Sequence, residues 1–211
     1  MKKVLFWLFC MVVAALPVQA QTVLVVGDSL SAGYGLRQHE AWPVLLGQKL
    51  AQAGYAHSVV NASTSGDTTA NGLSRIDGAL SAHKPDVVIL ALGANDGLRG
   101  LSLKSMRENI ESMTRKSQAA GAKVLIAGMQ LPPNYGPDYT QKFAETFGEV
   151  ARSTRSALLP FLLDGFGSDP LSFQSDGIHP VAAAQARIVE NVWTPLAPLL
   201  GKGGTRQARK H

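Results

Sequence analysis

The chain has 211 residues, of which 45% are hydrophobic and 17% charged, a composition typical of a globular domain and unlike that of a disordered chain. The formal net charge of +5 comes from the two ends, because residues 21–201 hold 14 of the 20 basic residues and all 15 acidic ones. A nucleic-acid-binding protein should carry basic residues over its whole fold, so this distribution argues against a nucleic-acid partner.

Residues 1–20 have the pattern of a secretory signal peptide. Lys2 and Lys3 precede an apolar run at 4–16, and Val18-Gln19-Ala20 is a cleavage site of the small-x-small type. The run is too short for a transmembrane helix. We therefore expect export to the periplasm, with Gln21 as the first residue of the mature protein.

The single cysteine, Cys10, lies within this apolar run. A lipoprotein signal places a small residue before its cysteine, and Phe9 in that position argues against a lipid anchor. Cleavage after Ala20 leaves a protein without cysteine, which has neither a thiol nucleophile nor a thiolate metal ligand.

Short runs rich in Val, Ile and Leu alternate with helical patterns along residues 21–201. Such alternation predicts a parallel sheet with right-handed crossovers, in a single three-layer α/β domain. The expected strands are 23–26, 58–60, 87–92, 124–127 and 158–163. The expected helices are 41–53, 69–83, 103–119, 143–154 and 181–200.

The basic end of the chain, residues 202–211, contains Lys202, Arg206, Arg209 and Lys210 and no acidic residue. We expect a solvated, disordered tail. A transient attraction to anionic lipid headgroups is the alternative interpretation.

In a parallel sheet the ligand site lies outside the carboxyl ends of the strands. The segments that follow the first four expected strands, 27–29, 61–67, 93–96 and 130–139, are therefore expected to gather at one edge of the sheet. Gly, Ser, Asn and Asp are frequent in these segments.

His179 follows Asp176 by three residues and precedes Pro180, which suits the entry to a helix. A carboxylate at this spacing can hold Nδ1 of the imidazole and leave Nε2 free as a base. The alternative is that Asp176 caps the last helix and His179 is a surface residue. No other histidine has an acid in this position.

Ser29 follows the first strand and is expected at a helix N-terminus, where backbone N–H groups favour developing negative charge. A serine hydroxyl needs a base to become a nucleophile, and His179 is the candidate. Gly66 can present its N–H closely to a ligand, and Asn95 offers a side-chain amide, so both are candidate oxyanion donors. Each alone is also compatible with ordinary turn chemistry.

Four segments, GDSL at 27–30, SGDT at 65–68, GAND at 93–96 and DGIH at 176–179, resemble the four blocks of the SGNH (GDSL-type) hydrolases in that family's order. GDSLSAGYG, AWP, NASTSGDT, GANDGLRG and LPPNYG are further similar to the bacterial periplasmic multifunctional acyl-thioesterase, lysophospholipase and arylesterase subgroup. Ala94 is a mild variation that leaves Asn95 in place.

The resemblance implies a flavodoxin-like α/β/α fold with a five-stranded parallel sheet in the order 2-1-3-4-5. It implies a Ser29, Asp176 and His179 triad, an oxyanion hole of Ser29, Gly66 and Asn95, and no metal or cofactor. It also implies hydrolysis of fatty acyl esters, acyl thioesters such as acyl-CoA, and lysophospholipids. We expect a monomer that acts on these small molecules.

The candidate substrate-binding residues follow strand ends and are apolar or aromatic, which suits an acyl chain better than a sugar. They are Leu98, Leu101, Leu131, Pro132 and Tyr135. Two alternatives remain: an exported carbohydrate O-deacetylase, which would prefer acetyl groups, and a non-catalytic lipid-binding protein on the same fold.

Overall fold

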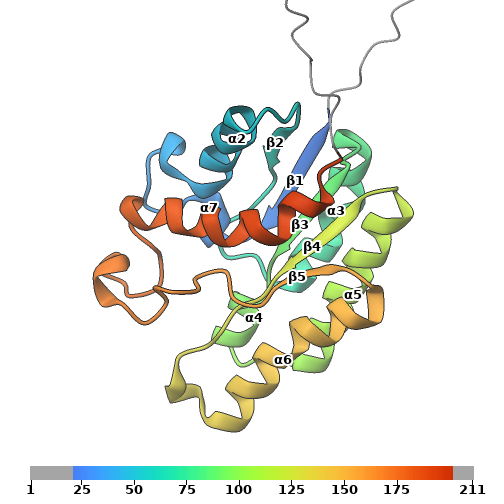
Figure 1. Ribbon diagram of the computed structural model, residues 1–211. Helices are drawn as coiled ribbons and strands as arrows, with labels where there is room; N and C mark the ends of the chain where they lie inside the picture. The colour runs from blue at the N-terminus through green and yellow to red at the C-terminus, as the bar shows by residue number, and fades with distance from the viewer. Residues whose placement is uncertain (1–20, 202–211) are drawn as a thin grey trace, which may run out of the picture.

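The computed structural model describes residues 21–201, so the expected signal peptide at 1–20 and the basic tail at 202–211 lie outside the described residues. Five parallel strands form one sheet between two layers of helices (Figure 1). The strand order β2-β1-β3-β4-β5 confirms the expected order 2-1-3-4-5. The strands are β1 Thr22–Gly27, β2 Ser58–Asn61, β3 Val87–Ala91, β4 Lys123–Ala127 and β5 Ala157–Leu159.

The three central strands form the core because helices cover both of their faces. Val25 of β1 pairs with Ile89 of β3, and Ile89 pairs with Leu125 of β4; all three side chains are fully buried. Strands covered on both faces cannot alternate apolar and polar residues, which explains the unbroken Val, Ile and Leu runs in the sequence.

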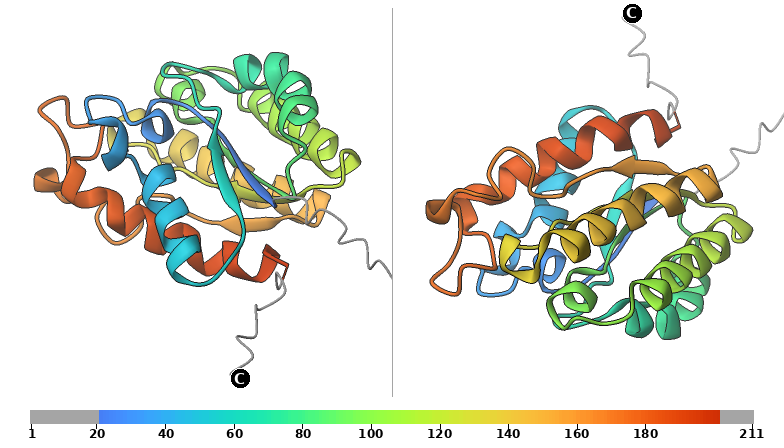
Figure 2. Two further views of the ribbon diagram at one scale, coloured as in Figure 1. Left: turned by 90° about the horizontal axis from the view of Figure 1, so that it is seen from above. Right: turned by 90° about the horizontal axis from the view of Figure 1, so that it is seen from below.

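The helices divide between the two faces of the sheet (Figure 2). α2 Trp42–Gln52 and α7 Ala182–Leu196 pack together on one face. α3 Thr69–His83, α5 Leu103–Ala119 and α6 Pro137–Thr154 cover the other. Two short helices, α1 Ser29–Ala32 and α4 Ala94–Leu98, stand at the carboxyl ends of β1 and β3, with single 3₁₀ turns at Gln38–Glu40, Pro133–Tyr135, Pro170–Ser172 and Ala197–Leu199. Across residues 21–201, no helix combines the length and apolar character needed to cross a membrane.

Three segments differ most from the sequence-based expectation, whereas the other boundaries agree to within a few residues. β5 ends at Leu159 rather than at residue 163, because Pro160 has no N–H to donate and the chain turns away there. α6 begins at Pro137, six residues before the expected start, with the proline in the first helical turn. Ala94–Leu98, expected as a loop, forms the short helix α4.

Candidate active site

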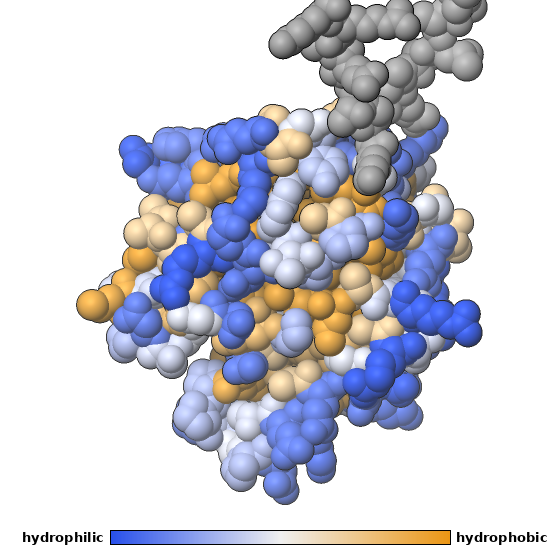
Figure 3. Space-filling view, in the orientation of Figure 1, coloured by the Kyte–Doolittle hydropathy of each residue, from blue (hydrophilic) through white to orange (hydrophobic). Residues whose placement is uncertain are grey.

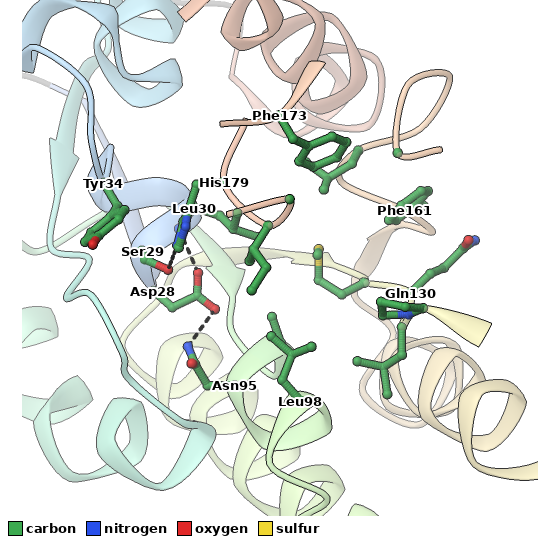
Figure 4. A pocket seen from close by; sticks show the side chains of 18 of the residues that line it. Asp28, Ser29, Leu30, Tyr34, Asn95, Leu98, Gln130, Phe161, Phe173 and His179 are labelled. Atoms are coloured by element: carbon green, nitrogen blue, oxygen red, sulfur yellow. Dashed lines mark hydrogen bonds between the residues drawn. The ribbon is translucent and has the colours of Figure 1, made fainter. Parts of the chain in front are cut away.

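Three strand ends bring the expected residues to one edge of the sheet. Ser29 follows β1, Gly66 lies in the loop after β2, and Asn95 is in α4 after β3. His179 comes from the loop before α7, and its side chain lies beside Ser29 (Figure 4). These residues therefore gather at the carboxyl ends of the parallel strands, which is the edge where the rule places a ligand site.

Ser29, His179 and Asp176 form a continuous chain of hydrogen bonds. Nε2 of His179 lies 2.8 Å from Oγ of Ser29, and Nδ1 of His179 lies 2.7 Å from Oδ2 of Asp176. Because a carboxylate can only accept, Nδ1 carries the proton in the neutral imidazole and Nε2 is left to accept from the serine hydroxyl. The arrangement can move a proton from Ser29 to His179.

The carboxylate of Asp176 is held by its own loop as well as by the imidazole. Its Oδ1 accepts the backbone N–H groups of Ile178 at 2.9 Å and of His179 at 3.0 Å. These bonds, together with the bond to the His179 ring, lower the pKa of Asp176 to about 2. The interpretation of Asp176 as a helix cap is wrong, because α7 begins at Ala182 and its N-cap is Val181.

Three candidate oxyanion donors, from Ser29, Gly66 and Asn95, line one cavity. Within residues 21–201 the backbone N–H groups of Ser29 and Gly66 have no acceptor, and Gly66 adopts φ +83°, a conformation that favours glycine. Nδ2 of Asn95 donates to the carbonyl of Asp67 at 3.0 Å and lies 3.4 Å from Oδ2 of Asp28. The bond to Asp67 fixes Asn95 against the loop that carries Gly66.

Arg75 of α3 also binds the loop that carries Gly66. Its Nε donates to the Asp67 carboxylate at 2.7 Å, and its other nitrogens donate to the carbonyls of Ala62 and Gly27. One guanidinium therefore ties the end of β1 to the loop after β2, which fixes Gly66 relative to the nucleophile. The role of Arg75 could not be predicted from the sequence, because its partners lie in loops that only the fold brings together.

Asp28 is a buried carboxylate next to the candidate nucleophile. Its side chain is 1% exposed, and Oδ1 accepts the N–H of Leu30 at 3.0 Å as the N-cap of α1. Burial raises the pKa of Asp28 from 3.8 to about 6, because the charged form loses its hydration. Since the folded state binds this proton more tightly than the unfolded chain, the contribution of Asp28 to stability falls as the pH rises from about 4 to 6.

We expect Asp28→Asn to stabilise the fold at neutral pH. The amide keeps an oxygen for Leu30 N–H and carries no charge, so it removes a cost of about 1–3 kcal/mol above pH 6. Urea unfolding should show this gain at pH 8 and little or none near pH 4. The matched control is Asp77→Asn, because the Asp77 side chain is 68% exposed. Equal stabilities of Asp28→Asn and wild type at pH 8 would contradict a buried ionised carboxylate.

A cavity of about 560 Å³ opens beside Ser29 and His179, and most residues that line it are apolar. Leu98, Leu131 and Pro132 line it as expected, whereas Leu101 and Tyr135 do not. The hydroxyl of Tyr135 instead donates to the carbonyl of Leu98 at 3.0 Å and supports that segment. Hydrophobic residues show at the surface between the segment after β5 and α6 (Figure 3).

Sequence reasoning missed much of the cavity wall. The segment after β5 was expected to continue as a strand to residue 163, but it leaves the sheet after Leu159 and folds back over the site. The wall residues that were not predicted include Tyr34, Met129, Phe161, Leu163, Phe173 and Ile178. The one available indication of this part of the wall was the presence of aromatic residues in the long segment after β5, which has few strand or helix signals. Residues 21–201 contain no cluster of three or more His, Cys, Asp and Glu side chains arranged to hold a metal ion.

Comparison with known proteins gives one consistent family. The model of the GDSL-like Lipase/Acylhydrolase family matches residues 25–187, which span all the residues of the hydrogen-bonded chain and the three donors. The match therefore covers most of the described domain.

Two curated relatives and one crystal structure are close. Esterase TesA of Pseudomonas aeruginosa is 52% identical over 86% of this chain and 90% of its own length. Thioesterase 1/protease 1/lysophospholipase L1 of Escherichia coli K12 is 38% identical over 92% of each chain. The crystal structure of the psychrotrophic esterase EstA from Pseudoalteromonas sp., inhibited by monoethylphosphonate, has a TM-score of 0.81 at 37% identity over 85% of this chain and 98% of its own.

Proposed function

Because this chain belongs to the GDSL-like lipase/acylhydrolase family and is an ester and thioester hydrolase, we propose that Ser29, His179 and Asp176 are its catalytic triad. The observation that carries the proposal is the pair of contacts on one imidazole, 2.8 Å to the Ser29 hydroxyl and 2.7 Å to the Asp176 carboxylate. Both are hydrogen-bond distances, so the base and its orienting acid are in place before substrate arrives.

In the first half of the reaction, Oγ of Ser29 attacks the acyl carbonyl while Nε2 of His179 takes the hydroxyl proton. Asp176 holds the proton on Nδ1 and stabilises the imidazolium that forms. The carbonyl oxygen, now negative, receives hydrogen bonds from the Ser29 and Gly66 N–H groups and from the Asn95 amide. The imidazolium then protonates the leaving alcohol or thiol, and an acyl-enzyme remains.

In the second half, water enters and His179 takes one of its protons as the water oxygen attacks the acyl-enzyme. Collapse of the second tetrahedral intermediate returns the proton to Ser29 and releases the carboxylic acid. The same three donors serve both intermediates, because the negative oxygen occupies the same place in each.

We further propose fatty acyl esters, acyl-CoA and lysophospholipids as the substrate class. The apolar cavity next to Ser29 supports a long acyl chain, and the Escherichia coli relative is named a thioesterase and lysophospholipase. A carbohydrate deacetylase would use a pocket with more polar partners.

We expect the specificity constant on p-nitrophenyl esters to rise from acetyl to octanoyl by about threefold or more per added CH₂ until the cavity is filled. Leu98→Gln places a polar group in the wall and should weaken octanoyl turnover while sparing acetyl turnover. Leu101→Gln is the matched control, because Leu101 is 42% exposed and lies outside the wall. A preference of the wild type for acetyl would instead support the deacetylase, and no turnover of any ester would support the lipid-binding protein.

We also propose that residues 1–20 are removed on export and that the mature protein is a periplasmic monomer, with at most transient contact between its basic tail and a membrane surface. The charge, length and cleavage-site pattern of residues 1–20 supports this proposal. N-terminal sequencing of the exported protein should begin at Gln21, and an intact N-terminus would contradict cleavage.

A further inference from the structure

Tyr34 lies against the imidazole of His179. The two ring centroids are 4.4 Å apart, with an angle of 36° between the ring planes. Tyr34 lies in the segment after α1 and lines the end of the cavity, on the opposite side of the imidazole from Phe161 and Phe173 (Figure 4). Its side chain is half exposed. An exposed tyrosine that keeps its ring against a histidine needs something to hold its backbone in place.

Gln174 fixes the backbone of Tyr34 next to the His179 loop by hydrogen bonds. Its Nε2 donates to the carbonyl of Tyr34 at 2.9 Å and to the carbonyl of Pro180 at 3.3 Å. Its backbone N–H donates to the carbonyl of His179 at 2.8 Å. One residue therefore ties the backbone of Tyr34 to the backbone on both sides of the His179–Pro180 bond.

The sequence leaves room for this side chain at Gly35. A Cβ atom built on Gly35 would lie 2.2 Å from Oε1 of Gln174, closer than real atoms approach. Gly35 also adopts φ +73°, which other residues rarely do. The backbone next to Tyr34 is thus shaped to receive the Gln174 amide.

The groups around the His179 ring explain what Tyr34 adds. Asp176 binds Nδ1, and Ser29 binds Nε2. Both contacts lie at the ring edge, and neither covers the ring face. An aromatic ring on that face limits rotation of the imidazole and so keeps both ring nitrogens directed at their partners.

On the basis of the proposed triad, we propose that Tyr34 is a positioning residue that fixes the plane of the His179 ring, and that Gln174 acts through Tyr34 by tying it to the His179 loop. Tyr34 and Gln174 act together, so both affect catalysis through one contact, that between the Tyr34 and His179 rings. The phenolic hydroxyl has no part in it.

The test is a set of four variants, Tyr34→Phe, Tyr34→Leu, Gln174→Ala and the Tyr34→Leu/Gln174→Ala double variant, assayed on p-nitrophenyl octanoate. Tyr34→Phe should keep kcat within about twofold, because the ring remains. Tyr34→Leu should lower kcat about 10-fold, and Gln174→Ala about 3- to 10-fold, with KM within about twofold in both. The double variant should match Tyr34→Leu, because residues that act through one contact are not additive.

Active-site titration with a fluorophosphonate normalises each kcat to folded enzyme. Tyr55→Leu and Gln118→Ala are the matched controls. Tyr55 packs on His57 outside the site, with ring centroids 6.0 Å apart, and the Gln118 amide joins Thr154 to Ser156. Both controls should keep the wild-type kcat per titrated site.

A wild-type kcat for Tyr34→Leu, or an effect confined to KM, would overturn the positioning role. If the fold-decreases in kcat of the two single variants multiplied in the double variant, Gln174 could not act through Tyr34. Ser29→Ala, assayed alongside, separates the two proposals. If Ser29→Ala is active, the proposed triad fails. If it is inactive while Tyr34→Leu is normal, only the present inference fails.

Discussion

Replacing Ser29 with alanine is expected to lower kcat on p-nitrophenyl octanoate by about 10⁴- to 10⁶-fold, because the variant has no atom that can form the acyl-enzyme. Binding should change little, since the cavity wall and the donors from Gly66 and Asn95 remain. The fold should also persist, because Asp28 rather than Ser29 caps α1.

The matched control for this experiment is Ser74→Ala. Ser74 is an exposed serine of α3 whose hydroxyl donates to the carbonyl of Asn71 at 2.7 Å, and it has no contact with the site. Ser74→Ala should keep wild-type kcat. If Ser29→Ala retained even a tenth of the wild-type kcat, Ser29 could not be the nucleophile.

Asp176→Asn is expected to lower kcat by about 10⁴-fold. The amide oxygen can still accept the N–H groups of Ile178 and His179, so the loop should keep its shape. The amide nitrogen, however, would donate toward Nδ1 of His179, which then has to accept and places the ring proton on Nε2. In that tautomer the imidazole cannot take the proton of Ser29.

The loss of kcat in Asp176→Asn should not depend on pH. With its pKa held at about 2, Asp176 stays ionised throughout the working range, so the loss in Asp176→Asn should persist from pH 6 to 9. Asp169→Asn is the control, because Asp169 also accepts a loop N–H and a second donor, Leu171 N–H and the Ser172 hydroxyl, but touches no histidine. Full activity of Asp176→Asn would remove Asp176 from the triad.

The family resemblance of the four sequence blocks implied the strand order that the structure has, and local patterns indicated the candidate residues that the fold brings together. Parallel strands leave a clear signal, because burial on both faces produces unbroken apolar runs. The catalytic candidates stand directly after these runs, or in the DGIH segment, so Ser29 and His179 could be paired although 150 residues separate them. Local patterns and one topological rule placed these candidates at one edge of the sheet, whereas the order of the strands rested on the family resemblance.

The wall of the cavity could not be predicted in the same way. Leu101 and Tyr135 follow strand ends as Leu98 does, yet they lie outside the wall, because position relative to a strand does not say which way a side chain points. Phe161 and Phe173 lie in the wall because the chain leaves the sheet after β5, which depends on a turn at Pro160. The contacts of Tyr34 and Gln174 are likewise properties of packed loops, for which no sequence period exists.

Reaction of the mature protein with a fluorophosphonate probe, followed by digestion and mass spectrometry of the labelled peptide, tests whether Ser29 is a nucleophile activated by His179. We expect one label per chain, located on Ser29, and none on Ser29→Ala. A stoichiometric label on another residue, or undiminished labelling of Ser29→Ala, would contradict this role of Ser29.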